Sequence, residues 1–165
     1  MLPMGEGGQA LAAPSRRLSR VLPRPLNPGD TVALVSPSKA TDDPFDLQLV
    51  SEAMQALGLK VKLAPHVDAR RGHLAGTDAQ RAGDINAMFA DPQVKGIICV
   101  RGGSGAARVL PLLDYGLIRR NPQVLLGYSD ITALRNAVLA QAGLVGFHGP
   151  IGAGRAESGR AMPQR

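Results

Sequence analysis

Short apolar runs alternate with amphipathic segments along most of this chain, and this alternation constrains the fold more than any other feature. The runs are too short for helices and are bounded by Gly, Pro or Asn, as is typical of buried strands. They predict strands at 31–36, 60–64, 96–100, 123–126 and 144–147. Because parallel neighbours need crossover connections, usually helices, we predict a doubly wound, mainly parallel α/β sheet of the flavodoxin-like or Rossmann-like type, a three-layer sandwich.

The first amphipathic segment lies between the first two predicted strands. Phe45, Leu49, Ala53 and Leu57 recur every four residues, and Gly58 follows them as a stop signal. This spacing predicts a helix that buries these four side chains.

Two later segments also carry helix signals. Thr77 and Gln80 have the spacing of a capping box, which marks a helix start. Apolar residues continue at helical spacing in both segments: Ala82, Ile85 and Phe89 in the first, and Ile131, Leu134 and Val138 in the second. We expect each set to face the sheet.

The ends of the chain differ from its middle. Residues 1–25 combine Gly, Pro, Ala and Arg without a helix or strand period, and we expect a disordered tail there. Residues 26–151 form the predicted folded domain, and 152–165 are expected to be a disordered or out-of-frame tail. The basic residues of the N-terminal segment follow its brief apolar patch instead of preceding it, which argues against a secretory signal. We therefore expect a cytoplasmic protein.

Composition excludes several functions. The net charge of +6 comes mostly from the ends, since residues 26–150 carry 12 basic and 11 acidic side chains. With aromatic residues at only 3%, this pattern does not indicate nucleic-acid binding. No apolar run approaches the roughly 18 residues of a membrane span. The single cysteine, Cys99, provides neither an internal disulfide nor a metal cluster, and we predict no metal or other cofactor.

Two loops carry the candidate chemistry, and each follows a predicted strand. The first is Arg101, Gly102, Gly103, Ser104 and Gly105, whose glycines would let the backbone approach an anion. It lacks the Lys-Ser/Thr ending of a P-loop, so a purely structural turn is an equal alternative.

The second loop reads Gly-Tyr-Ser-Asp and resembles the sharp strand-to-helix turn that presents a nucleophilic serine. Gly127 lies two residues before Ser129, but Ile131 occupies the second glycine position of that motif. Ser129 or Asp130 could instead be an ordinary helix N-cap. Since both loops follow parallel strands, we expect them to open at the same edge of the sheet, where a serine would meet backbone donors.

Other reactive side chains are weaker candidates. His66, His73 and His148 lie in predicted loops or strand ends, where an ordinary packing role is expected. Cys99 lies inside an apolar strand and is expected to be a buried, unreactive thiol.

The stretch from Leu26 to Pro150 resembles the LD-carboxypeptidases, also called muramoyltetrapeptide carboxypeptidases, a family of serine peptidases. The resemblance lies in motifs that occur in the family's order: Leu-Asn-Pro-Gly-Asp at 26–30, 32–38, 72–78, 101–105, 112–115, Asn-Pro at 121–122, Gly-Tyr-Ser-Asp with the two residues after it at 127–132, and His-Gly-Pro at 148–150. It implies the family's N-terminal α/β domain, with the serine of the Gly-Tyr-Ser-Asp motif as nucleophile.

The resemblance assigns roles to both loops. Ser129 would attack the amide before a terminal D-alanine of a murein tetrapeptide, in cell-wall recycling. The backbone N–H groups of Asp130 and Gly103 would hold the oxyanion. Arg101, with Gly102 and Ser104 in the same loop, would contact the substrate, although a loop salt bridge is an equal reading for Arg101. The alternatives are a peptidase of the microcin-immunity type and a non-catalytic α/β module that binds an anion or a peptide.

The chain also departs from the family. Ser104 stands where the family usually has Tyr, and Arg135 where it often has His. The family's Glu and His partners lie in a C-terminal domain, and the likeness ends at Pro150. We therefore expect impaired activity, a truncation or frameshift after Pro150, and a partner that is either a second copy or a C-terminal domain supplied in trans.

Overall fold

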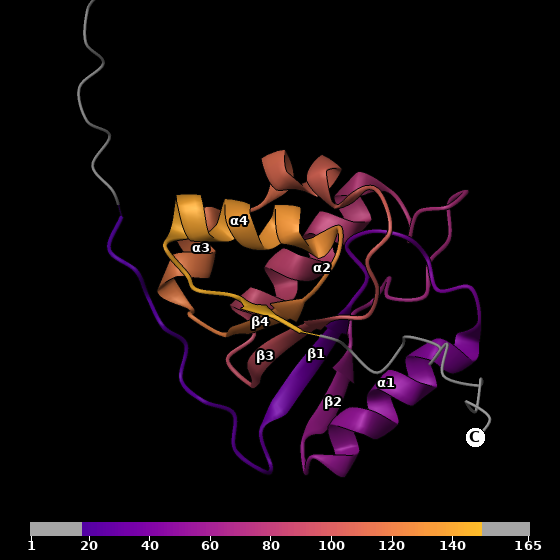
Figure 1. Ribbon diagram of the computed structural model, residues 1–165, viewed down its shortest axis with the longest axis horizontal. Helices are drawn as coiled ribbons and strands as arrows, with labels where there is room; N and C mark the ends of the chain where they lie inside the picture. Colours follow the sequence, from indigo (N-terminus) through magenta and orange to yellow (C-terminus); the bar gives the residue numbers. More distant parts are fainter. Residues whose placement is uncertain (1–17, 150–165) are drawn as a thin grey trace, which may run out of the picture.

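The computed structural model describes residues 18–149 and shows one parallel sheet (Figure 1). Its strands are β1 (Thr31–Val35), β2 (Lys60–Leu63), β3 (Val94–Cys99), β4 (Val124–Gly127) and β5 (Phe147–His148). They lie in the order β2-β1-β3-β4-β5, and every neighbouring pair is parallel. This is the flavodoxin-like strand order, and it confirms the predicted α/β fold.

Helices join the strands, as parallel pairing requires. They are α1 (Pro44–Ala56), α2 (Asp78–Ala90), the 3-10 helix η1 (Ala106–Leu112), α3 (Tyr115–Arg120) and α4 (Ile131–Ala142). In Figure 1, α2, α3 and α4 lie on one side of the sheet, and α1 lies on the other side next to β2. None of the helices in the described part of the chain has the length and hydrophobicity needed to cross a bilayer.

Much of the core lies between the sheet and helices α2–α4, and Val50 and Met54 of α1 belong to the same buried cluster. The predicted inner faces of α2 and α4 are confirmed, because all six of their apolar side chains are buried: Ala82, Ile85, Phe89, Ile131, Leu134 and Val138. The capping box is also present, with Thr77 and Gln80 each accepting the other's backbone N–H.

The first helix forms as predicted, but the predicted buried face is wrong. Phe45 and Leu57 are 53% and 65% exposed, whereas Val50 and Met54 are buried. An α-helix has 3.6 residues per turn, so a strict four-residue spacing drifts by about 40° at each step and leaves the face where it began. Spacings that mix three and four residues keep to one side.

Two further expectations need correction at the edges of the domain. The fifth strand is Phe147–His148, not 144–147, and Leu144 instead pairs with Val21. Val21 donates its N–H to the Gly143 carbonyl (2.9 Å) and accepts the Val145 N–H (2.9 Å). The predicted flexible tail is therefore wrong for residues 18–25, which pack along the domain. The rest of that tail and the predicted tail at 152–165 lie outside the described residues.

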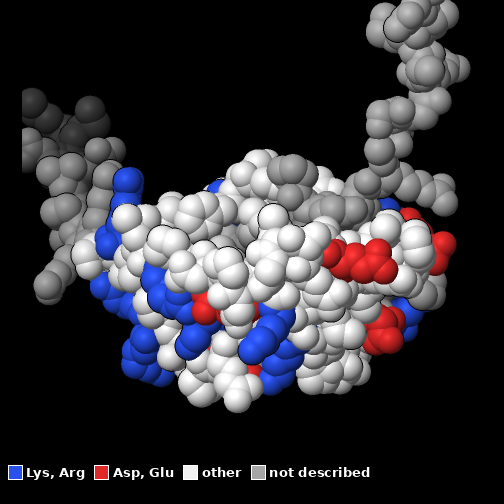
Figure 2. Space-filling view, turned by 90° about the horizontal axis from the view of Figure 1, so that it is seen from below, with Lys and Arg blue, Asp and Glu red and all other residues white. Residues whose placement is uncertain are grey.

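Charge is distributed unevenly over the surface. On the face shown in Figure 2, Lys and Arg side chains form separate patches with uncharged and acidic residues between them. Several basic residues are paired with acidic ones, including Lys62 with Asp91 (2.5 Å) and Arg24 with Asp30 (2.7 Å).

Candidate active site

The two predicted loops lie side by side at the carboxyl ends of β3 and β4. A Cβ atom built on Gly102 would lie 2.8 Å from Ser129 Cβ and 3.2 Å from its Oγ. Such contacts are too close for any side chain, so Gly102 allows the glycine loop to rest against the serine turn. The expectation that both loops open at one edge of the sheet is confirmed.

Ser129 occupies a sharp turn between β4 and α4. Its φ is +58°, and it is the only described residue other than glycine with a positive φ. Such a conformation costs about 1–3 kcal/mol and persists only where the surroundings impose it. Ser129 is nevertheless exposed to solvent. A strained serine held outward between a strand and a helix is the geometry of a nucleophile turn.

The residues beside Ser129 explain how the turn closes. A Cβ on Gly127 would lie 2.5 Å from Ile131 Cγ2 and 3.2 Å from Cys99 Cβ, so only glycine fits at this position. Ile131, at the second glycine position of the motif, is fully buried. Its side chain occupies the space that the missing Gly127 side chain leaves, which accounts for the departure from the two-glycine pattern.

Asp130 does not cap α4 with its side chain, so that alternative is wrong for this residue. Its carboxylate Oδ2 instead accepts the Ser38 hydroxyl (2.5 Å), from the loop after β1, and the Ala106 N–H (2.8 Å), at the end of the glycine loop. The residue after the serine thus connects the ends of three strands.

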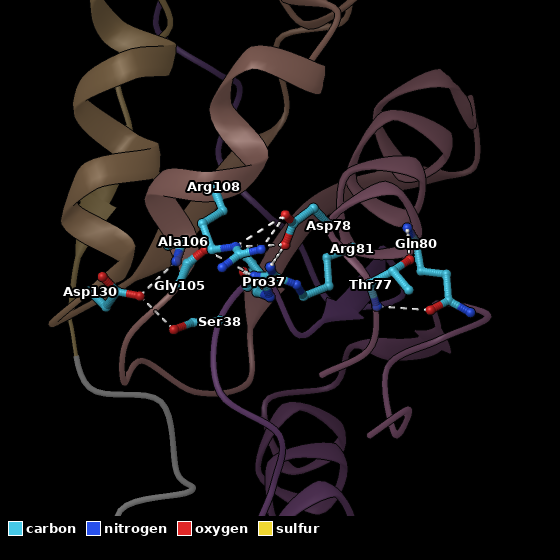
Figure 3. A network of polar contacts seen from close by, with 10 residues as sticks. All are labelled: Pro37, Ser38, Thr77, Asp78, Gln80, Arg81, Gly105, Ala106, Arg108 and Asp130. Carbon is cyan, nitrogen blue, oxygen red and sulfur yellow. Dashed lines mark hydrogen bonds and ion pairs between the residues drawn. The ribbon is translucent and has the colours of Figure 1, made fainter. Parts of the chain in front are cut away.

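Arg81 of α2 reaches the same region from the opposite side (Figure 3). Its side chain is almost completely buried, and its Nη1 donates to the carbonyls of Gly105 (3.0 Å) and Pro37. Its Nη2 pairs with Asp78, which also forms a two-pronged ion pair with Arg108. The sequence did not indicate Arg81 or Ser38 as site residues. The available signal was an arginine next to the apolar face of a predicted helix.

Residues 32–149 match the family of the LD-carboxypeptidase N-terminal domain. The chain belongs to this family. It is 42% identical over 129 residues to the Bacillus subtilis (strain 168) protein named "Probable murein peptide carboxypeptidase", covering 78% of this chain and 40% of that protein. It is 35% identical to the murein tetrapeptide carboxypeptidase of Pseudomonas aeruginosa, covering 81% and 43%.

Solved structures agree with the family assignment. The microcin self-immunity protein MccF matches with a TM-score of 0.76 and 32% identity over 81% of this chain and 40% of that one. The muramoyltetrapeptide carboxypeptidase of Oxalobacter formigenes matches with a TM-score of 0.68 and 28% identity, covering 78% and 44%. The chain therefore spans about two fifths of the length of these relatives.

The remaining residues of the LD-carboxypeptidase glycine loop have mixed surroundings. Arg101 pairs with Asp42 (2.7 Å) and lies 3.7 Å from Asp46, which favours the loop salt bridge over a free substrate contact. Lys39 and Arg101 together hold the pKa of Asp42 below its usual value. Gly103 and Ser104 are exposed, and Gly103 has a φ of +129°.

No histidine in the described segment pairs with Ser129. His66 Nδ1 binds Asp84 Oδ1 (2.8 Å), and His148 Nδ1 contacts Arg135 Nη1 (2.9 Å). His73 lines a separate polar pocket with Arg71 and Arg108. His66 and His148 thus have the ordinary packing or pairing roles that the sequence favoured.

Cys99 is fully buried, and this burial raises the pKa of its thiol to about 12. A thiol with this pKa is uncharged near neutral pH and is a poor nucleophile. Within residues 18–149 no cluster of three or more His, Cys, Asp or Glu side chains could hold a metal ion.

Proposed function

We propose that this chain carries the nucleophile of a serine carboxypeptidase that releases terminal D-alanine from murein tetrapeptides. The observation that carries the proposal is the exposed Ser129, held at positive φ with Gly102 in contact with it. The names of the Bacillus and Pseudomonas relatives support the murein peptide as the substrate class.

In the proposed reaction, Ser129 Oγ attacks the carbonyl carbon of the amide between an L-configured centre and D-alanine. The carbonyl oxygen becomes an oxyanion, which the backbone N–H groups of Asp130 and Gly103 stabilise. Loss of one such donor typically costs about 3–4 kcal/mol of transition-state stabilisation. The amine of D-alanine leaves with a proton, and water then hydrolyses the acyl-enzyme.

The serine proton requires a base. The family resemblance assigns this base to a Glu and His pair in a C-terminal domain. His66 and His148 are already paired with Asp84 and Arg135, so neither supports an alternative base. We therefore propose that the 165-residue chain alone turns over substrate slowly, and that a base from outside residues 18–149 raises its rate.

Fluorophosphonate labelling tests this proposal. We expect a fluorophosphonate to label Ser129, and the label to disappear in Ser129→Ala. Ser51→Ala is the matched control, because it removes a serine hydroxyl of α1 that is bonded to the Leu47 carbonyl and should leave labelling intact. Absence of labelling, together with binding of a murein tetrapeptide, would instead favour a non-catalytic peptide-binding module.

A second substrate class is supported by the structural match to the microcin self-immunity protein. A peptide joined to a nucleotide could occupy the same site, because the attacking serine and oxyanion donors are common to both reactions. Competition decides between them: the tetrapeptide should protect Ser129 from labelling at a lower concentration than an aminoacyl sulfamoyl nucleoside. The reverse order would favour the second substrate.

A further inference from the structure

The peptide bond between Gly105 and Ala106 is held at both of its polar ends. Its carbonyl oxygen accepts a hydrogen bond from Arg81 Nη1 (3.0 Å), and its N–H donates to Asp130 Oδ2 (2.8 Å). Figure 3 shows the two side chains approaching this peptide from α2 and from the serine turn. The glycine loop is thus fixed at its last residue by charged groups of opposite sign.

The same two side chains also hold the loop after β1. Arg81 donates to the Pro37 carbonyl, and Asp130 accepts from the Ser38 hydroxyl. Hydrogen bonds that involve a charged partner are stronger than neutral ones. Arg81 and Asp130 therefore bind the β1 loop at two adjacent residues and connect it to the glycine loop.

Glycine makes such a restraint necessary. Gly103 and Gly105 have φ values of +129° and +132°, which side chains rarely allow, and glycine exchanges easily between positive and negative φ. A loop with these residues can rotate its peptide units, so the direction of each N–H depends on what holds the loop. The proposed oxyanion donor, Gly103, lies two residues before the clamped peptide.

We propose that Arg81 and the Asp130 carboxylate form a clamp that sets the orientation of the glycine loop and hence of the oxyanion donor. The inference rests on the proposed function. Both side chains are positioning residues, since they act through the loop.

Amide hydrogen exchange of the 165-residue chain tests the clamp without requiring catalysis. We expect Asp130→Ala to raise the exchange rate of the Ala106 N–H by about 10- to 100-fold, the loss expected for one charge-assisted hydrogen bond. Arg81→Met keeps the apolar stem of the side chain and should raise exchange and line broadening at Gly103 and Gly105.

Matched variants separate the clamp from general loss of stability. Arg108→Met removes the other partner of Asp78, but its side chain makes no bond to the glycine loop, so exchange at Ala106 should stay unchanged. Asp130→Asn and Arg81→Lys keep shape and part of the bonding, and should give intermediate rates. They also serve as the test if the larger changes prevent folding. Unchanged Ala106 exchange, or an equal rise across the whole domain, overturns the clamp.

Labelling of the same variants connects the clamp to the reaction. If wild-type Ser129 reacts with a fluorophosphonate, Arg81→Met should slow the reaction at least about tenfold, and Arg81→Lys should recover part of the rate. An unchanged rate in Arg81→Met overturns the positioning role. If wild-type Ser129 does not react, the proposed function fails, and the exchange rates still decide whether the clamp exists.

Discussion

The carboxyl edge of the sheet and the face of the sheet on the side of α1 differ in how completely they are filled. At the edge, the buried Arg81 and the partly buried Asp130 bind the loops that follow β1 and β3. On the α1 side, a hollow of about 470 Å³ lies between α1, residues 23–26 and the sheet. Its lining is almost entirely apolar, with Met54, Ile98, Val124, Leu126 and Phe147 among its residues.

This difference shows which part of the domain is organised by its own contacts. Parallel sheets normally have both faces covered by helices. Here α2, α3 and α4 cover one face, whereas α1 packs mainly beside β2 at the other (Figure 1). None of residues 101–105 or 127–132 lines the hollow, so the two candidate loops do not depend on it directly.

The largest expected effect compares two neighbouring residues of β4. Leu125 is fully buried on the α2–α4 side, whereas Leu126 is half-buried and lines the hollow. We expect Leu125→Ala to lower the free energy of unfolding by about 2–5 kcal/mol, and Leu126→Ala by about 1 kcal/mol. Urea unfolding measures both. Equal losses would mean that the hollow is as tightly packed as the core.

The next effect concerns the close contact between the two loops. Gly102→Ala would place a methyl group 2.8 Å from Ser129 Cβ, so one of the loops must move. We expect a loss of about 1–3 kcal/mol in stability, typical of overpacking, together with at least tenfold slower fluorophosphonate labelling.

Gly83→Ala is the matched control for Gly102→Ala. Gly83 lies in α2, and a Cβ there would meet no atom within 4 Å. This substitution should raise stability by about 0.5–1 kcal/mol and leave labelling unchanged. If Gly102→Ala behaved in the same way, the loops would not be in the contact described.

The sequence predicted features that depend on nearby residues. The strand and helix order, the capping box of Thr77 and the serine turn at Ser129 all follow from local spacing. The face of α1 could not be predicted, because two apolar stripes compete on that helix and only the sheet selects between them. Likewise, Val21 pairs with Leu144, far along the chain, so composition alone made residues 18–25 look unstructured.

The clamp was missed for the same reason. Arg81 binds carbonyls at Pro37 and Gly105, and the carboxylate of Asp130 binds Ser38, so each partner is distant in sequence. Carbonyl groups have no signature in the sequence, since every residue has one. A local rule therefore offered a helix cap as one alternative for Asp130, which is the common use of Asp before a helix.

The smallest expected effect is a change with pH in the hydrogen bonds at the charged edge of the sheet. Arg108, together with Arg81, holds the pKa of the Asp78 carboxyl below its usual value. An acid with a lower pKa in the folded state stabilises the fold above its unfolded pKa, about 3.9 for Asp, and loses this contribution as pH falls through the folded value.

Lowering the pH from about 5 to about 2 should therefore weaken the anchor of Arg81 and lower the protection factor of the Ala106 N–H, which is the exchange rate of the unstructured chain divided by the measured rate at the same pH. In Asp78→Asn this pH dependence should be smaller. Asp91→Asn is the matched control, because the Asp91 carboxyl also has a lowered pKa, from Lys62, but lies away from the glycine loop. It should change the pH dependence of the melting temperature and leave Ala106 exchange as in the wild type. The same response in both variants would show that Ala106 reports on the whole domain, and the distinction between a clamped edge and the rest of the fold would not hold.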